Sequence, residues 1–445
     1  MNFTPAIIAK QLAELESFAG KPSRYIVAFS GGLDSSVLLH ALVNILTEEK
    51  NEVPIFAIHI DHGLQLESSS WVELCRKTAA DFGVEFQSIK VNVQLKSGKG
   101  PEASARDARY SALCTEICDD DWLLTAHHRE DQAETLLLNL IRGSGPAGVA
   151  GISRIRRFGA GWLARPMLNV DQADLQSYAN DNGFRWIEDP SNTDRRFDRN
   201  FLRHEIMPRL KSRWSDITAR LQRSAVHAGD ASQLLIELAQ IDLKNLSSNS
   251  ARIPIDQLTD LPVGRQRNVI RFALRNQGLS TPTTAQLNRV IHEVILARED
   301  AQPLVTWPGV VVRRYRNSLY LMPESLTATI ESTPILGNEL LLGHGLGRLS
   351  FELKANIGLS KELFDNGLTV KARIGGERIS PLGQSHTREL KKLLQEEGIV
   401  PWMRDRLPLI YSGDRLVAVG DLWLAADAVS NPGIVVCWAG RPALH

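Results

Sequence analysis

A glycine-rich turn between a short apolar run and a helical period constrains this chain more than any other feature. The stretch YIVAFSGGLDSSVLLHAL, residues 25–42, reads as a buried strand, a tight turn and a helix. Gly31 and Gly32 lack a Cβ, so the backbone of the turn can approach an anion closely. The amide groups that open the following helix point at the same place, with the helix dipole behind them. We therefore expect a phosphate-binding turn.

Strand-like and helical segments alternate through the first part of the chain. Further strands are expected at VPIFAIHI, VEFQSIKVNV and DWLLTA, and helices are expected to begin at Asp34, Ser68, Pro101 and Asp131. The strands are nearly continuous apolar runs, which is typical of strands that are covered on both faces. The alternation predicts an α/β fold with a doubly wound parallel sheet.

The length of the chain predicts more than one domain, because 445 residues exceed what one hydrophobic core usually supports. We place an α/β domain at residues 1–214, where a basic helical segment ends. A mainly helical domain is expected at 215–336, with a hairpin at LVTWPGVVVRRYRNSLYLM, and a small α+β domain at 337–445. In the last domain the segment TRELKKLLQEEG is expected to form a helix that stops at Gly398.

Composition gives no global sign of a partner. The 51 basic side chains balance 51 acidic ones, so any nucleic-acid surface has to be local. The 4 cysteines form no CxxC pair, which argues against a disulfide framework or a thiolate zinc site and favours a reducing cytoplasm. The N-terminus lacks a basic start before an apolar core, and no uncharged apolar run reaches the roughly 18 residues that cross a bilayer. A cytoplasmic protein is expected.

The turn argues against cleavage of the γ-phosphate of ATP. No lysine lies between Lys21 and Lys50, whereas a Walker A loop needs one to reach the β- and γ-phosphates. Ser30 and Ser35 offer hydroxyl donors, and Asp34 either caps the helix or holds a Mg²⁺ that bridges phosphates. The plainer interpretation is a glycine turn before a capped helix, but its place after the first strand of a doubly wound sheet favours a nucleotide site.

The motif SGGLDS resembles the signature of the PP-loop, or N-type, ATP pyrophosphatases. That resemblance implies a PP-loop ATPase domain in which ATP is cleaved between its α- and β-phosphates. A carbonyl-type oxygen is adenylated, and a nitrogen or sulfur nucleophile then attacks. It also implies Mg²⁺ at Asp34 and an ATP-binding set of Ser30, Gly31, Gly32, Leu33, Asp34, Ser35 and, in the next strand end, Asp61.

Further stretches are similar to the tRNA(Ile)-lysidine synthetases. They are IDHGL at 60–64, EASARDARY at 102–110, TAHHREDQAET at 125–135, RPML from Arg165, EDPSN from Glu188, RNFLRHEIMPRL from Arg199 and, near the end, KKLLQEEGIVPWMRDRLPLIYSGD. The resemblance covers the first domain densely and the third clearly, while the middle domain matches only in helical character and position. Glu130 stands where the family more often has aspartate, which leaves its role open.

The resemblance implies a ligase that joins free L-lysine to C2 of the wobble cytidine in the CAU anticodon of isoleucine tRNA. ATP adenylates the cytosine oxygen with release of pyrophosphate, and the lysine ε-amine then displaces AMP to form lysidine. Decoding thereby changes from AUG to AUA. The expected partners are the tRNA and free lysine, with no membrane, and a dimer is one oligomeric state that the sequence leaves open.

Two carboxylates are expected to bind the lysine substrate. Asp131 and Glu134 lie three residues apart on a helix and so share a face, where they could hold ammonium groups. A solvated helix face is the alternative. Arg106 and Arg109 are expected to meet charge on the α-phosphate or the adenylated base, because a planar fork suits phosphate. For these the alternative is an ion pair with Asp107 or Glu102.

Histidines gather near two strand ends at His59, His62, His127 and His128. Side chains alternate in direction along a strand, so the adjacent pair would not both face one metal, which argues against zinc. One member of that pair is expected near ATP or the base, and we assign His127 as catalytic. The other histidines are expected to be structural.

Basic side chains crowd the segment between residues 195 and 223, where they fit phosphate contacts with the anticodon arm. A solvated helix face with internal ion pairs is the alternative. Arg199 and Arg203 are assigned to its catalytic side, and Trp402 in the last domain is expected to be structural. The predicted tRNA contacts are Arg195, Arg196, Arg209, Lys391, Lys392, Arg404 and Arg406.

Two other functions compete with this interpretation. A PP-loop tRNA thiolation enzyme would need cysteines to carry sulfur or bind a cluster, and Cys114 and Cys118 have the wrong spacing. A nucleotide-sensing RNA-binding module would need no catalysis, but the intact Asp34, Asp131 and Glu134 favour an enzyme.

Overall fold

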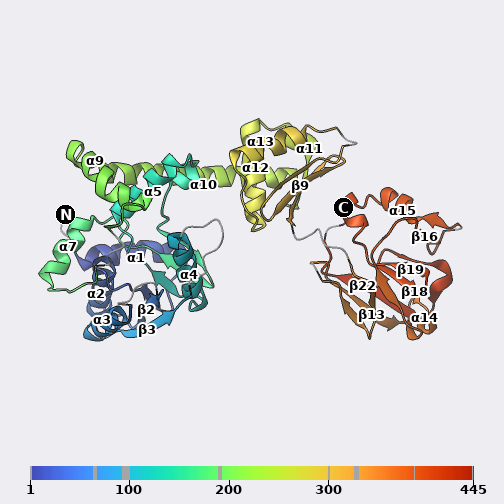
Figure 1. Ribbon diagram of the computed structural model, residues 1–445, viewed down its shortest axis with the longest axis horizontal. Coiled ribbons are helices and arrows are strands. Elements are labelled where there is room, and N and C mark those ends of the chain that lie inside the picture. Colours follow the sequence, from blue (N-terminus) through green and yellow to red (C-terminus); the bar gives the residue numbers. More distant parts are fainter. Residues whose placement is uncertain are drawn as a thin grey trace. The chain divides into compact units, whose positions relative to one another are not determined.

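The computed structural model describes residues 3–63, 68–92, 101–188, 193–298, 301–324, 330–343, 345–384, 386–442 and 444 (Figure 1). The contacts divide the chain into two compact units, Met1–Leu234 and Leu235–His445. Each unit is described by itself below. Within the described ranges no helix has both the length and the hydropathy that crossing a bilayer requires.

A parallel sheet organises the first unit and confirms the predicted fold class. Its described strands follow the order β3-β2-β1-β4-β6-β5, and only β5, at one edge, runs antiparallel to its neighbour. The strands are β1 Tyr25–Ala28, β2 Ile55–Asp61, β3 Glu85–Lys90, β4 Trp122–Leu124, β5 Ile155–Phe158 and β6 Gly161–Ala164.

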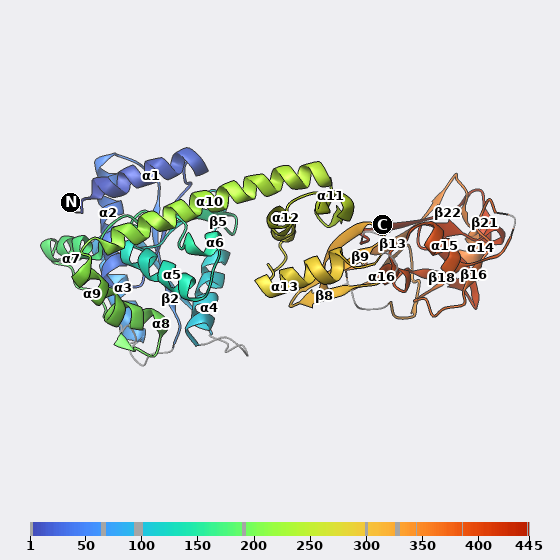
Figure 2. The same cartoon turned by 90° about the horizontal axis from the view of Figure 1, so that it is seen from above.

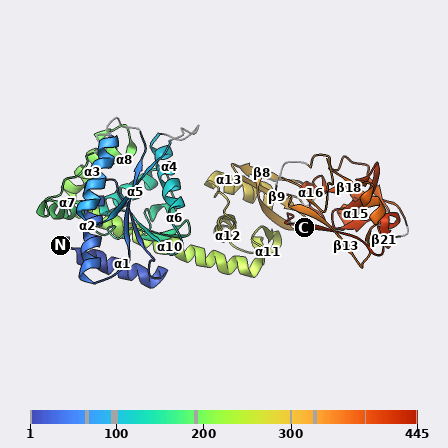
Figure 3. The ribbon, with the colours of Figure 1, turned by 90° about the horizontal axis from the view of Figure 1, so that it is seen from below.

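Helices cover both faces of this sheet, as the apolar strands predicted. Along β1, Tyr25 and Val27 pack into one core with α1, α2, α3 and α7, whereas Ile26 packs into the other with α4. This alternation follows from the pleat of a strand. Figures 1 and 3 show α2 and α3 on one side of the strands and α4 on the other. These helices are α1 Pro5–Ala19, α2 Leu33–Glu48, α3 Ser68–Asp81, α4 Pro101–Thr115 and α7 Gln172–Asp181.

Further helical elements of the first unit follow β4 in the chain. Helix α5 begins at Arg129, two residues before the predicted start, because His128 forms its N-cap and the Asp131 carboxylate accepts a hydrogen bond from the His128 amide. The predicted basic helical segment is also present, with one π-helical turn between two α-helices. The elements are α5 Arg129–Ile141, α6 Pro146–Val149, α8 Asp198–Phe201, η2 Leu202–Ile206 and α9 Met207–Arg213.

The second unit begins within α10, Ile217–Leu246, which Figure 2 shows as one uninterrupted helix. The predicted hairpin is instead a three-stranded meander, since the chain turns at Gly309 and again at Arg316, both with positive φ. A fourth short strand completes the sheet in the order β7-β10-β9-β8. The elements are β7 Arg252–Pro254, α11 Ile255–Thr259, α12 Val263–Asn276, α13 Thr284–Arg289, η3 Val290–Ile295, β8 Leu304–Trp307, β9 Val310–Tyr315 and β10 Ser318–Pro323.

The rest of the second unit is built on antiparallel sheets, ordered β11-β15-β18-β19-β20 and β12-β13-β22-β14-β21, with a short pair β16-β17. The predicted helix forms and is followed by Gly398 with φ 79°. The elements are β11 Thr333–Pro334, β12 Glu339–Leu341, β13 Arg348–Lys354, β14 Gly358–Leu359, α14 Lys361–Asp365, β15 Thr369–Lys371, β16 Arg378–Ile379, β17 Arg388–Glu389, α15 Leu390–Glu396, α16 Pro401–Arg404, β18 Leu409–Ser412, β19 Arg415–Val419, β20 Trp423–Leu424, η5 Ala426–Ala428, β21 Val429–Ser430 and β22 Gly433–Ala439.

Trp402 is structural, as expected from the sequence. Its ring packs edge-on against Tyr320, with centroids 5.0 Å apart, and against Tyr315 at 6.4 Å. The Arg313 guanidinium lies 5.6 Å from the centre of the same ring. Trp402 is therefore partly buried against the core of this unit.

Candidate active site

The glycine-rich turn joins β1 to α2, and within it the Gly32 amide donates to the Ser30 hydroxyl oxygen at 3.3 Å. Gly32 is the N-cap of α2, and no side chain bonds to the first amides of the helix. Asp34 therefore does not cap α2. The Ser30 and Ser35 hydroxyls lie 3.1 Å apart, and that of Ser35 donates to the Gly32 carbonyl at 3.0 Å. Hydroxyl and amide donors thus converge where an anion would bind.

Gly31 is required at this turn by both conformation and space. Its φ is +75°, and a Cβ there would lie 2.6 Å from Cys75 Sγ and 2.7 Å from Ile187 Cδ1. The Ile187 amide also donates to the Gly31 carbonyl at 2.9 Å. A side chain at residue 31 would push the turn away from both neighbours.

Cys75 and His59 support the turn from below and take no part in its chemistry. His59 Nδ1 lies 3.0 Å from the Phe29 carbonyl oxygen and 3.5 Å from Cys75 Sγ. Burial raises the pKa of Cys75 to about 12, so this group is a neutral thiol at physiological pH. Burial also lowers the pKa of His59, consistent with a structural ring.

Asp34 points one oxygen at an unfilled position. Its Oδ1 is buried with no hydrogen-bond partner, and its Oδ2 lies 3.7 Å from His128 Nε2. Burial raises the pKa of this carboxyl, because the charged form is not fully solvated. A buried oxygen without a partner fits a cation ligand. In the described part of the chain no three His, Cys, Asp or Glu side chains gather to bind a metal.

His128 is the histidine that lies among the acidic groups. Its Nδ1 is 3.1 Å from Glu130 Oε2, and its Nε2 is 3.5 Å from Asp131 Oδ2. Burial disfavours the charged ring, but Asp131, Glu130 and Asp34 outweigh it and raise the pKa of His128 to about 9. His128 is therefore an imidazolium at neutral pH.

His127, which the sequence suggested as catalytic, has the opposite environment. Its Nδ1 shares a hydrogen bond of 2.9 Å with the Thr125 hydroxyl. Burial lowers the pKa of His127 to about 3; Asp131 opposes this shift, and Arg165 and Arg199 support it. His127 is neutral beside the site, while His128 carries charge within it. The sequence alone could not distinguish the roles of these two adjacent histidines, because the capping role of His128 depends on where α5 begins.

Glu130 connects three elements, which accounts for a position that the sequence left open. Its Oε2 accepts hydrogen bonds from His128 Nδ1 and from the Gln172 amide at the start of α7, at 3.1 and 3.0 Å. Its Oε1 accepts from Lys211 Nζ at 3.1 Å. These donors hold the pKa of Glu130 below its ordinary value against the effect of burial. Glu130 therefore orients the charged ring of His128.

The two carboxylates assigned to lysine lie together on α5, and each is bonded to the same two arginines. Arg199 donates to Glu134 Oε2 at 2.9 Å and to Asp131 Oδ1 at 2.8 Å. Arg203 donates to Glu134 Oε1 at 2.7 Å and to Asp131 Oδ1 at 3.1 Å. Glu134 is 1% exposed, so its predicted alternative, a solvated helix face, is wrong. We call these four residues the paired cluster.

The paired cluster forms because its members repeat at helical spacing. Arg199 on α8 and Arg203 on the π-helical turn are four residues apart and so face the same way, toward Asp131 and Glu134 three apart on α5. Single π-turns are frequent at functional sites. Burial alone would raise the pKa of Asp131, but the His128 ring and the Arg199 guanidinium hold it well below its ordinary value.

A second group of charges lacks such partners. Arg106 and Arg109 on α4 lie with their guanidinium carbons 5.4 and 5.6 Å from the centre of the Tyr110 ring. Burial lowers the pKa of Arg109, and Arg106 and Arg199 lower it further. Neither arginine of α4 forms an ion pair with a carboxylate whose side chain is described.

The remaining predicted residues differ in exposure. Asp61 ends β2, and its Oδ1 accepts a hydrogen bond from the Gly63 amide. Arg195 and Arg196 are exposed and pair with Glu205 and Asp194. Arg209, Lys391 and Lys392 are also exposed.

Arg404 and Arg406 are turned inward. Arg404 donates to the Ile399 carbonyl at 2.9 Å and to the Tyr315 hydroxyl at 3.0 Å. Arg406 is only 3% exposed. Of the basic residues predicted in this part of the chain, the two lysines are therefore the ones presented to solvent.

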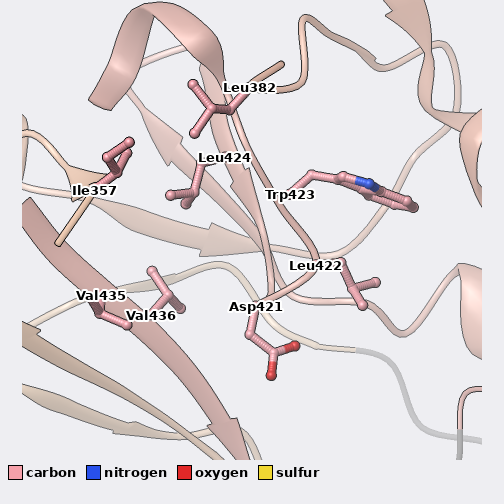
Figure 4. A pocket seen from close by; sticks show the side chains of 8 residues that line it. All are labelled: Ile357, Leu382, Asp421, Leu422, Trp423, Leu424, Val435 and Val436. Carbon is pink, nitrogen blue, oxygen red and sulfur yellow. The ribbon is translucent and has the colours of Figure 1, made fainter. Parts of the chain in front are cut away.

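A hollow with a volume of about 350 Å³ lies elsewhere, between β20, β22 and neighbouring loops of the second unit. Seven of the eight side chains drawn in Figure 4 are apolar, and the eighth is Asp421. Such a lining offers no cationic side chain for phosphate, and its one charged side chain is an acid, so the hollow is not a candidate for the nucleotide chemistry.

Comparisons with known proteins agree with the motifs. A PP-loop domain matches residues 5–210, a TilS substrate binding domain 253–320, and a TilS substrate C-terminal domain 368–438. The tRNA(Ile)-lysidine synthase of Coxiella burnetii is 39% identical over 94% of this chain and 92% of its own length. The enzyme of the same name from Photorhabdus laumondii is 40% identical over 96% and 94%. A solved U34-tRNA thiolase, NcsA from Methanococcus maripaludis, is 16% identical, covers 50% of this chain and 78% of its own, and has a TM-score of 0.41, a likeness too distant to bear on function.

Proposed function

This chain belongs to the tRNA(Ile)-lysidine synthase family and is an ATP-using ligase of the PP-loop class that forms lysidine on tRNA(Ile), and on that premise we propose how its residues divide the work. Free L-lysine is joined to C2 of the wobble cytidine in the CAU anticodon. The cytosine oxygen first attacks the α-phosphate of ATP and pyrophosphate leaves. The lysine ε-amine then attacks C2 and AMP leaves, so that the anticodon reads AUA in place of AUG.

The turn after β1 binds ATP. Its amides and hydroxyls surround the pyrophosphate, with Asp61 at the neighbouring strand end. Asp34 holds Mg²⁺, and the support for this role is its buried oxygen without a partner. Bound Mg²⁺ supplies positive charge to the leaving pyrophosphate. The proposed ATP-binding residues are Ser30, Gly31, Gly32, Leu33, Asp34, Ser35 and Asp61.

The paired cluster binds free lysine. Lysine carries two ammonium groups and a carboxylate, so each of its charged groups can find a group of opposite charge among the two carboxylates and two guanidiniums. Glu134 and Asp131 take ammonium groups, while Arg199 and Arg203 are released to the substrate carboxylate or to the reacting phosphate. Because the pKa of Asp131 is lowered, its carboxylate is a poor proton acceptor, and we assign it to orienting the substrate.

The adenylation step uses cations that already face the carboxyl edge of the sheet. His128, charged and held by Glu130, lies beside Asp34. Arg106 and Arg109 stabilise charge on the α-phosphate and the adenylated base, and Arg109 is the more buried of the two. Neutral His127 lines the same edge and can donate or accept a hydrogen bond but supplies no charge.

The tRNA is held by exposed basic residues on both units. Arg195, Arg196 and Arg209 approach the anticodon arm, and Lys391 and Lys392 approach the acceptor arm, while Arg404 and Arg406 shape the surface beneath those lysines. Residues 1–214 then form the catalytic domain, and 215–336 and 337–445 form two tRNA-binding domains. All 4 cysteines are free thiols, which fits a cytoplasmic enzyme. A dimer stays a prediction from the sequence.

Two observations carry this proposal. Asp131 and Glu134 are paired with Arg199 and Arg203. In the same unit, the helix that follows the glycine-rich turn has no side-chain cap. The test is pyrophosphate production with ATP and unmodified isoleucine tRNA that carries CAU, with and without free lysine. Mass analysis of the wobble nucleoside follows, and a transcript with uridine at the wobble position is the control. Lysine-dependent mass gain at the cytidine supports the proposal. A gain that needs a sulfur donor instead would assign the chain to thiolation.

A further inference from the structure

Arg165 is a buried cation that the mechanism above does not use. It directly follows β6 and is 5% exposed. Its Nη1 donates to the Ser153 carbonyl at 2.7 Å and to the Ser153 hydroxyl at 3.3 Å, while its Nε is buried with no hydrogen-bond partner. The titratable groups that most affect it are the Tyr110 phenol, which also hydrogen-bonds to it, and the cations Arg156 and Arg106. A buried guanidinium without an anion is costly, so such a group usually has a ligand.

The surroundings of Tyr110 show that Arg165 is not alone. Burial disfavours ionisation of the Tyr110 phenol, yet Arg106, Arg165 and Arg109 overcome it and lower the pKa of Tyr110. Three guanidiniums therefore surround one phenol, and the phenol is the only acid among them. Among the described side chains this is the reverse of the paired cluster, where each guanidinium has a carboxylate.

The position of Arg165 matches the edge where the substrates react. Ala164 at the end of β6 pairs with Leu124 at the end of β4, and Val27 of β1 also pairs with Leu124. Arg165 thus leaves the sheet at the same carboxyl edge as the glycine-rich turn. In open α/β sheets this edge is where ligands bind.

Guanidinium groups in this arrangement are complementary to phosphoryl oxygens, because each planar fork can donate to two of them. We propose that Arg165 is a further phosphoryl-binding residue of this site, forming with Arg106, Arg109 and Tyr110 a pocket for a phosphoryl group of ATP or of the anticodon-loop backbone. The proposal rests on the proposed function, whose substrates supply both groups. The competing account is that Arg165 only ties β6 to Ser153.

The test compares Arg165→Met with Arg157→Met, a matched control whose exposed side chain lies on the adjacent strand β5. Binding of ATP with Mg²⁺ is measured by calorimetry, and binding of an anticodon stem-loop RNA is measured by filter retention over a range of salt concentrations. If the phosphoryl group comes from ATP, the Kd of ATP should rise about tenfold to a hundredfold in Arg165→Met alone. If it comes from RNA, the Kd of the stem-loop should rise and its salt slope should fall by about 0.7 to 0.9.

Either result supports the pocket and identifies its source. Equal ATP and RNA binding by folded Arg165→Met and Arg157→Met would overturn it, even if the melting temperature of Arg165→Met were lower. Should Arg165→Met not fold, Arg165→Lys decides by the same two measurements, because it keeps a cation at this position but removes the planar fork that binds two phosphoryl oxygens. A wild-type protein that made no lysidine would remove the proposed function, while the binding data would still decide the pocket.

Discussion

Two groups of charged side chains meet the carboxyl edge of the parallel sheet, and they are built in opposite ways. In the paired cluster, Asp131 and Glu134 are bonded to two arginines at 2.7 to 3.1 Å. Around Tyr110, three arginines have only a phenol to oppose them among the side chains that the structure describes. The first group satisfies its own charges, and the second leaves them for an incoming anion. A ligand of mixed charge suits the first group and a polyanion suits the second.

The largest effect on activity is expected at Asp34, which lies beside the charged ring of His128. Asp34→Asn should lower pyrophosphate release by about 10²-fold to 10³-fold, since the proposed Mg²⁺ ligand is lost at the point where charge develops. Binding of tRNA should persist, and Asp181→Asn at the exposed end of α7 is the control. Unchanged release in Asp34→Asn would show that another group holds the cation.

The next prediction compares how the paired cluster and the arginines near Tyr110 contribute to the free energy of unfolding. Glu134→Gln should lower the free energy of unfolding by about 1–3 kcal/mol, because two partly buried guanidiniums each lose one of their two carboxylate partners. Arg109→Gln should leave that free energy unchanged or raise it, because it relieves repulsion among cations. Urea unfolding of both variants measures the difference. A similar loss in both would mean that the arginines near Tyr110 have partners too.

The pH dependence of stability should show the two adjacent histidines acting in opposite directions. The folded pKa of His128 is about 9, above its ordinary 6.5, so its contribution is full below about pH 6.5 and is lost as pH rises through 9. The folded pKa of His127 is about 3, so stability is lost as pH falls below 6.5, where only the unfolded chain takes the proton. Each effect is on the order of a few kcal/mol.

Unfolding measured across this range without ATP or Mg²⁺ checks the assignment. His128→Gln should flatten the alkaline side of the profile and leave the acid side, and His127→Gln should do the reverse. If His127→Gln flattened the alkaline side, the charged ring would have been assigned to the wrong residue.

The smallest effect is expected on the surface. Arg196 is 89% exposed at its side chain and bonded only to Asp194 two residues away, so Arg196→Gln should change stability by less than about 0.5 kcal/mol. Because Arg196 is proposed to contact tRNA, Arg196→Gln should reduce the salt slope of tRNA binding by about 0.7 to 0.9. An unchanged slope would place the anticodon arm elsewhere on the protein.

The fold was largely predictable because its signals are local. The apolar strands and Gly31 predict the strand–turn–helix directly, and the structure places α2 within one residue of the expected start. The hairpin near residue 310 was misjudged, since two separate turns, at Gly309 and Arg316, produce three strands. Motif resemblance proposed the site residues, but not how they pair.

The part of the site that could not be predicted from the sequence consists of contacts between residues far apart in the chain. Asp131 and Arg199 are 68 positions apart, and nothing in one sequence says that they meet. Glu130 looked like a mere departure from the family pattern, yet its longer side chain reaches His128, Gln172 and Lys211. Arg165 was noticed only as the first letter of a motif, because its lack of a carboxylate partner is visible only once the neighbours are in place.

The most direct test of the division between the two groups separates the two steps of the reaction. Pyrophosphate release is measured in a single turnover with ATP and tRNA but no lysine, and lysidine formation is measured after lysine is added. Folded Glu134→Gln should release pyrophosphate like the wild type and form little lysidine, whereas Arg109→Gln should fail at the first step. Loss of pyrophosphate release in Glu134→Gln, or normal release in Arg109→Gln, would contradict the assignment of lysine to the paired cluster and phosphate to the unpaired arginines.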